Sequence, residues 1–248
     1  MLVIFILTLI NLVLSVLGIF FGDAEPIYYI FTSLACLGMM AILFIPIFTH
    51  KIFKVRIPSS LYIVFVLFCY CAIILGDVQD YFGTYKHWDT MLHFSSGMML
   101  AVFGFILVNT LNGTKKGNVR LSPFFVAATA FCFVMTIQSL WEICEFLSDE
   151  WFGLNAQTYM VTGSSFGSPD GEMLVGHEAL RDTMEDFMLD GVGGLIVSII
   201  GYINLKKGKP GFADAELKKI DGETDNGEEN ENTKAKKAKS KKDKTKSS

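Results

Sequence analysis

The chain has 248 residues, 51% of them hydrophobic, and a mean hydropathy of +0.42. This composition, combined with long uninterrupted apolar runs, argues against a water-soluble protein and indicates a membrane protein. The formal net charge of -4 is the sum of two opposite populations, an acidic core and a lysine-rich tail.

Six apolar runs are long enough to cross a bilayer, because about 20 apolar residues span its hydrocarbon core. They predict transmembrane spans at about residues 2–21, 27–49, 58–76, 89–111, 122–147 and 181–205. The first run lacks a basic leader and an A-x-A-like cleavage site, so we expect a retained helix rather than a signal peptide. Because lipid offers backbone groups no partners, the sequence predicts an all-α polytopic membrane protein, a bundle of about six transmembrane helices.

All five cysteines fall inside these runs, without a C-x-x-C pair or the spacing of metal ligands. They are Cys36, Cys69, Cys71, Cys132 and Cys144. We interpret them as small packing residues rather than as disulfide partners or zinc ligands.

A charged tail, residues 206–248, follows the transmembrane domain of residues 1–205. It holds 13 of the 21 basic residues beside an acidic patch, "DGETDNGEENE". Such a stretch has almost nothing to bury, so we expect it to be disordered. It either lies against anionic lipid headgroups or is simply solvated. Nucleic-acid binding is not expected, because neither aromatic side chains nor a folded nucleic-acid-binding domain accompanies the lysines.

The basic residues of the core predict the topology. Six of its eight lie in two connections, as Lys51, Lys54 and Arg56, and as Lys115, Lys116 and Arg120. The positive-inside rule assigns both connections, and with six spans both termini, to the cytoplasm. The sixteen acidic residues of the core then all fall at or near the opposite side.

Three helices carry polar residues one turn apart at that opposite side. Asp89 and His93 begin the fourth span, Gln138, Glu142, Glu145 and Asp149 end the fifth, and Asp182, Asp186 and Asp190 begin the sixth. Residues at this spacing share one helix face. We therefore expect the three stripes to meet in the outer half of the membrane, facing Arg181.

Two explanations compete for these residues. Asp89 and Asp182 could merely complement helix dipoles, and Asp149 could be an ordinary interfacial residue. Capping does not explain acids farther into the helices, where an isolated charge costs about 2.5–3.5 kcal/mol. Acids packed closely must take up protons or hold cations. The predicted metal ligands are Asp89, His93, Glu142, Glu145, Asp182, Asp186 and Asp190.

The ligand types narrow the cation only partly. Oxygen-rich ligation with one imidazole suits Mg, Mn or Ca, whereas Zn or Fe accepts the histidine readily with fewer carboxylates. The Glu-x-x-His pairs of di-iron bundle proteins are absent. In the sixth span, a row of small residues predicts a helix-packing surface. The row is Gly191, Gly194, Ser198 and Gly201.

At "WDTMLHF", "WEICEF" and "RDTMEDFM" the sequence resembles the YjdF-like family of bacterial inner-membrane proteins. The likeness covers about residues 60–205 and departs at "GHEALRDT", where the family has Gly-Asp-x-Trp before the Asp-Thr pair. A looser similarity links the chain to VanZ-like membrane proteins. The resemblance implies a multi-pass protein of the bacterial plasma membrane and adds support to the site, but it implies no substrate.

Three functions fit these residues. The first is a metal-dependent enzyme acting on a lipid-linked or headgroup substrate at the outer face, with Glu145 as the candidate proton shuttle. The second is a structural or accessory membrane protein whose cluster ties helices together. The third is a cation- or proton-coupled transporter, which the apolar inner halves of these helices and the lack of an inverted repeat disfavour.

Overall fold

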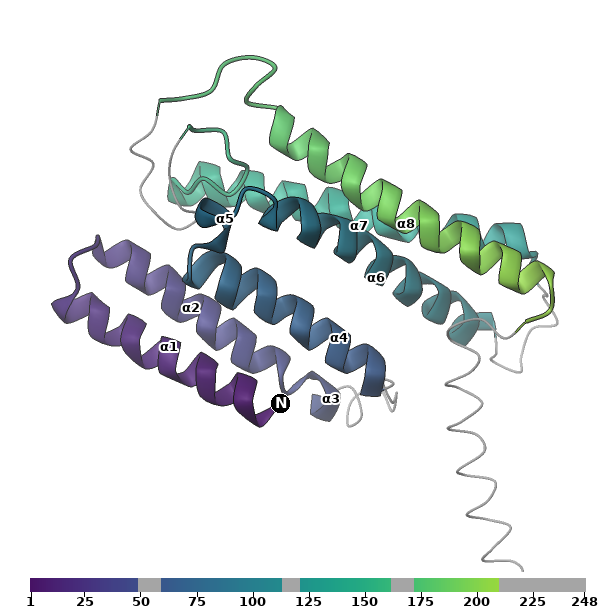
Figure 1. Ribbon diagram of the computed structural model, residues 1–248, viewed down its shortest axis with the longest axis horizontal. Helices are drawn as coiled ribbons and strands as arrows, with labels where there is room; N and C mark the ends of the chain where they lie inside the picture. Colours follow the sequence, from purple (N-terminus) through teal and green to yellow (C-terminus); the bar gives the residue numbers. More distant parts are fainter. Residues whose placement is uncertain (49–58, 113–120, 162–171, 210–248) are drawn as a thin grey trace, which may run out of the picture.

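The computed structural model describes residues 1–48, 59–112, 121–161 and 172–209 (Figure 1). Its helical segments are α1 (Leu2–Phe21), α2 (Pro26–Ile42), α3 (Ile45–Phe48), α4 (Ser59–Cys69), η2 (Tyr70–Val78), α5 (Tyr81–Thr84), α6 (Trp88–Asn112), α7 (Pro123–Phe152) and α8 (Arg181–Lys206). The described residues form no strand, only an isolated bridge between Met160 and Met173. The predicted all-α fold is confirmed.

Five helical stretches are long and apolar enough to cross a membrane: α1, α4 with its π-helical continuation η2, α6, α7 and α8. The predicted second span is shorter than expected, because α2 has 17 residues and ends at Ile42. Pro46 explains this end, since its ring and missing N–H oppose a continuous helix. The predicted fifth span is longer and continues to Phe152.

Several predictions fall on residues outside the described part of the chain. Both basic connections that fix the topology belong there in whole or in part, at residues 49–58 and 113–120, and so does the tail from residue 210. The cytoplasmic assignment of the termini and the disorder of the tail therefore stay predictions.

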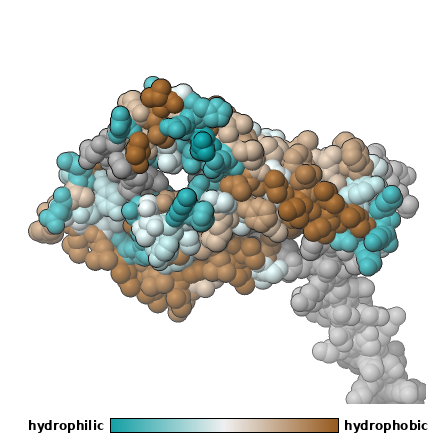
Figure 2. Space-filling view, turned by 45° about the horizontal axis from the view of Figure 1, so that its top comes forward, coloured by the Kyte–Doolittle hydropathy of each residue, from teal (hydrophilic) through white to brown (hydrophobic). Residues whose placement is uncertain are grey.

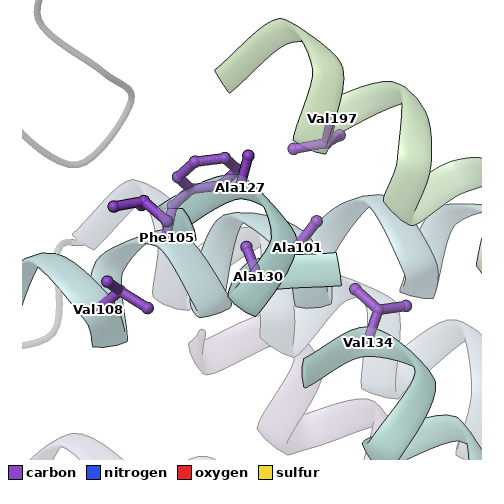
Figure 3. Close-up of a cluster of buried hydrophobic side chains, with 8 residues drawn as sticks. Ala101, Phe105, Val108, Ala127, Ala130, Val134 and Val197 are labelled. Carbon is purple, nitrogen blue, oxygen red and sulfur yellow. The ribbon is translucent and has the colours of Figure 1, made fainter. Parts of the chain in front are cut away.

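The long helices are arranged in two groups (Figure 1). We call α1, α2 and α4–η2 the amino-terminal group and α6, α7 and α8 the carboxy-terminal trio. The amino-terminal group encloses a core of Cys36, Met39, Val66, Cys69 and Ile74. The trio encloses a second core, Ala101, Phe105, Val108, Val126, Ala127, Ala130, Val134 and Val197 (Figure 3). Each group thus has its own apolar interior.

Small residues bring the backbones of the trio into contact. A methyl group added to Gly97 of α6 would collide with the backbone of Asp190 in α8. One added to Gly193 would collide with the backbone carbonyl of Phe94. Such close approach is typical of membrane helices that pack through small residues. The contact fixes α6 and α8 against each other at the level of their acidic residues.

The predicted small-residue surface of α8 is confirmed at three positions: Gly194, Ser198 and Gly201 are buried. Gly191 differs, because a methyl group there would meet only the sulfur of Met135, at an ordinary 3.5 Å. Gly193 makes the closer contact, because the helix rotation turns it, rather than Gly191, toward α6. The packing surface is therefore shifted from the predicted one.

The outer flanks of the long helices expose large apolar side chains, such as Leu14 and Leu195. Figure 2 shows such apolar flanks, and hydrophilic side chains gathered around a hollow at one end of the molecule. An apolar exterior of this kind suits lipid as its solvent. All five cysteines are free; Cys36 and Cys69 are buried in the amino-terminal core as packing residues, whereas Cys132 and Cys144 are exposed, so the packing interpretation does not hold for these two.

Candidate functional site

The polar residues of the trio lie at one end because α7 runs antiparallel to α6 and α8 (Figure 1). Asp89 lies in the first turn of α6, and Asp182 lies in the first turn of α8. Glu142 and Glu145 lie in the second half of α7. The end of one helix is therefore brought beside the beginnings of the other two, as the spacing predicted.

His93 is the centre of this cluster. Its Nε2 lies 3.4 Å from Asp89 Oδ1 and 3.7 Å from Asp186 Oδ1. Its Nδ1 lies 2.8 Å from Asp190 Oδ2. At this distance one proton lies between the two atoms, and Nδ1 is its donor when Asp190 is ionised. The other ring nitrogen is thereby directed at two carboxylates, one from α6 and one from α8.

Asp190 contacts the His93 ring at Nδ1, the nitrogen that does not face Asp89 and Asp186. Its side chain is fully buried, and its second oxygen accepts a hydrogen bond from the Ser96 hydroxyl. Ser96 was not predicted as part of the site, although its position three residues after His93 could have suggested it. Asp190 was predicted as a metal ligand; it contacts His93 and Ser96 and belongs to neither group of three possible ligands described below.

Helix α7 contributes the other wall of the cluster. Gln138 Nε2 donates to Glu142 Oε1 at 2.8 Å, and it lies 3.3 Å from His93 Nδ1. Trp141 Nε1 donates to Glu145 Oε1 at 2.8 Å. Glu142 is only 4% exposed, and its Oε2 has no hydrogen-bond partner among the described residues. One carboxylate oxygen in the wall is therefore buried and unsatisfied.

The ligand atoms form two triads that have Asp186 in common. One atom each from Asp89, His93 and Asp186 lie within 4.8 Å of one another, and the same holds for Glu142, Glu145 and Asp186. This spacing is what a bound cation needs, because oxygens that share a cation at about 2.0–2.6 Å lie up to about 4–5 Å apart. Five of the seven predicted ligands therefore belong to these triads.

Two residues predicted at the cluster belong to neither triad. Asp182 is half-buried and belongs to neither triad. The expectation that Arg181 faces the acids is wrong, because its guanidinium lies 3.9 Å from Glu185 and both side chains are mostly exposed. Arg181 and Glu185 are one helical turn apart, on a face of α8 turned away from Asp186. Within the described residues, no lysine or arginine pairs with the acids of the triads.

Asp149 anchors the segment that follows α7. Its two oxygens accept hydrogen bonds from the backbone N–H groups of Ala156, at 2.7 Å, and Gln157, at 3.0 Å. The amide of Gln157 in turn donates to the Thr183 hydroxyl at the start of α8, at 3.1 Å. Asp149 is therefore not an ordinary interfacial residue, because it ties the connection to the mouth of the cluster.

The fold and the cluster define a polytopic helical membrane protein with a buried carboxylate–histidine centre. Residues 2–207 match the family described as "Predicted membrane protein (DUF2238)". The chain belongs to this family. No curated protein and no solved structure matches the chain.

Proposed function

We propose that this protein binds a divalent cation between Asp89, His93 and Asp186 and acts as a metal-dependent enzyme on a lipid-linked or headgroup substrate. One observation carries the proposal. His93 Nδ1 lies 2.8 Å from Asp190 Oδ2, while Nε2 faces two carboxylates. A carboxylate on the far ring nitrogen is the usual support of a metal-binding histidine, because it fixes the tautomer and raises the basicity of the ligating nitrogen.

The donor set fits a cation chemically. One imidazole and several carboxylates suit Mn or Mg, and Zn, Fe or Ca is compatible with the same atoms. When bound, such a cation polarises a carbonyl or phosphoryl oxygen and activates a coordinated water. The residues of this chain hold it, exclude lipid from it and, at Glu145, accept the released proton.

An aromatic cleft beside the cluster supports a substrate at the membrane surface. Its volume is about 440 Å³, and it is lined by Tyr81, Thr84, Tyr85, Lys86, His87 and Trp88. The rings of Tyr81 and Trp88 meet edge to face, with centroids 4.9 Å apart. Aromatic side chains with a polar tip favour the headgroup level of a membrane. Trp88, one of the lining residues, directly precedes Asp89 in α6.

The proposed location is the outer half of a bacterial plasma membrane, in agreement with the resemblance to YjdF-like proteins and with the basic cytoplasmic connections. The lysine-rich tail would then lie at the inner face, where anionic headgroups attract lysines. The other half of the trio holds the apolar core of Figure 3, whose eight buried residues are all alanine, valine or phenylalanine, with Tyr202 packed against them. The acids and His93 therefore lie at one end of the trio, whereas a transporter needs a polar route through both halves. This arrangement favours an enzyme over a transporter.

Metal analysis of the purified full-length protein tests the proposal. We expect a divalent cation at a fixed ratio to protein, lost on His93→Gln and retained in Glu185→Gln, which changes an exposed acid on the same end of the trio. Vesicles of phosphatidylethanolamine and phosphatidylglycerol then test the activity, and we expect metal-dependent release of headgroup or acyl product. Absence of any bound cation would contradict the site. A bound cation without turnover would support the accessory function instead.

A further inference from the structure

We infer that the cluster holds two divalent cations, the second bound by Glu142, Glu145 and Asp186, with the Asp186 carboxylate bridging the pair. This inference rests on the proposed function, because it adds a second cation beside the proposed first one. It concerns the α7 wall of the cluster, which the first cation does not require.

The geometry of Asp186 is the first argument. The residue is only 2% exposed and belongs to both triads. Its Oδ1 lies 3.7 Å from His93 Nε2, on the side of the first triad. A carboxylate has a second oxygen, and a bridging carboxylate can bind one cation with each. Two-metal sites of this kind hold their ions about 3.5–4 Å apart and stabilise both oxygens of a displacement reaction.

The unsatisfied oxygen of Glu142 is an independent argument. Oε1 accepts the Gln138 amide, whereas the buried Oε2 has no partner among the described residues. Buried polar atoms without a partner are rare, and each indicates an unseen ligand, water or strain. A cation between the Glu142, Glu145 and Asp186 carboxylates would satisfy this oxygen and offset the repulsion of three acids packed together.

The second site changes the role of Glu145. Trp141 Nε1 donates to Glu145 Oε1 at 2.8 Å, which fixes the direction of the carboxylate and leaves Oε2 for a ligand. Glu145 then binds a cation rather than shuttling a proton. The three ligands are all carboxylates, which are the preferred ligands of hard cations such as Mg and Mn.

Manganese binding to the full-length protein in detergent tests the inference. The protein is stripped with a chelator, loaded with Mn²⁺, freed of excess metal by gel filtration and measured by elemental analysis and electron paramagnetic resonance. We expect two Mn per chain with a spin-coupled spectrum. Glu145→Gln should bind one Mn with an uncoupled spectrum, and Glu142→Gln should do the same. Glu185→Gln, the matched exposed control, should keep two.

The outcomes separate this inference from the proposed function. One Mn in the unaltered protein, still one in Glu145→Gln, would overturn the second cation and leave the first in place. Two Mn retained in both Glu145→Gln and Glu142→Gln would also overturn the assignment. No bound Mn in the unaltered protein, with no other divalent cation bound, would overturn both. Thermal unfolding of each variant identifies loss of metal that results from misfolding, and only folded variants are compared.

Discussion

The two helix groups both expose apolar flanks, but they bury different kinds of side chain. In the amino-terminal group, α1, α2 and α4 carry no charged residue and η2 carries only Asp77. The buried polar side chains of this group are small hydroxyls: Thr8, Ser15, Thr32 and Ser33. The carboxy-terminal trio buries His93, Glu142, Asp186 and Asp190. An apolar core alone is thus sufficient to build half of this fold. The acids of the other half are a specific addition, and buried ionisable groups in membrane segments are typical of functional sites.

The two groups also differ in how closely their helices approach. In the amino-terminal group, a methyl group added to Gly18 or Gly76 would meet the side chain of Tyr29 or Phe82, and one added to Gly38 would meet no atom within 4 Å. In the trio, Gly97 and Gly193 press directly on neighbouring backbone. Backbone contact cannot adjust as a flexible side chain can. The trio is therefore a rigid frame for the acids, whereas the amino-terminal group tolerates more change, and four measurements test this contrast.

The largest effect is expected from Asp186→Asn. This residue belongs to both triads, so its loss removes a ligand from every proposed cation. We expect metal affinity to fall by more than roughly 100-fold, beyond the roughly 10- to 100-fold cost of losing a supporting group. Isothermal titration with Mn²⁺ measures the change. Affinity equal to that of the unaltered protein would remove Asp186 from the site.

Asp190→Asn should weaken metal binding less, by roughly 10- to 100-fold, because it removes support from His93 rather than a ligand. The asparagine keeps the volume of the fully buried side chain but replaces one carboxylate oxygen with an amide group. Ser96→Ala, which removes the hydroxyl on the other side of Asp190, should act in the same direction. An effect as large as that of Asp186→Asn would instead make Asp190 a ligand.

Gly97→Ala should destabilise the trio by about 1–3 kcal/mol, the usual cost of overpacking. The added methyl group collides with the Asp190 backbone, and separation of α6 from α8 should also lower metal affinity. Gly38→Ala is the matched control in the amino-terminal group, where the same change meets open space. The free energy of unfolding in mixed detergent micelles compares the two. Equal effects would contradict the contrast in packing.

The smallest effect is expected from Thr32→Val in the amino-terminal group. The buried hydroxyl donates to the Tyr29 carbonyl at 3.1 Å, and Ser33 donates to the same carbonyl at 2.7 Å. Hydrogen bonds between membrane side chains contribute about 0.6 kcal/mol on average. We expect the free energy of unfolding to change by no more than about this amount, with metal content unaffected. Loss of metal in Thr32→Val would show that the amino-terminal group influences the metal site of the trio.

Much of this architecture was predictable from the sequence, because lipid limits the backbone structures that can span a membrane. Apolar runs located the helices, and one-turn spacing on antiparallel spans brought Asp89, Glu142 and Asp186 to one end. Spacing defines a face of one helix, however, and not the rotation of that face relative to its neighbours. The division into two triads and the outward turn of Arg181 depend on this rotation. It is set by backbone contacts at Gly97 and Gly193, which the sequence did not reveal.

The hydrogen bond between His93 and Asp190 joins residues 97 positions apart in the chain. During synthesis, α6 and α7 enter the membrane before α8 exists, so their acids reach lipid without the partners that later surround them. Arrival of the last helix completes the cluster and relieves that exposure. Completion of the site therefore requires α8 to pack against α6 and α7, and a chain that ended before Arg181 would leave the His93 ring without Asp186 and Asp190.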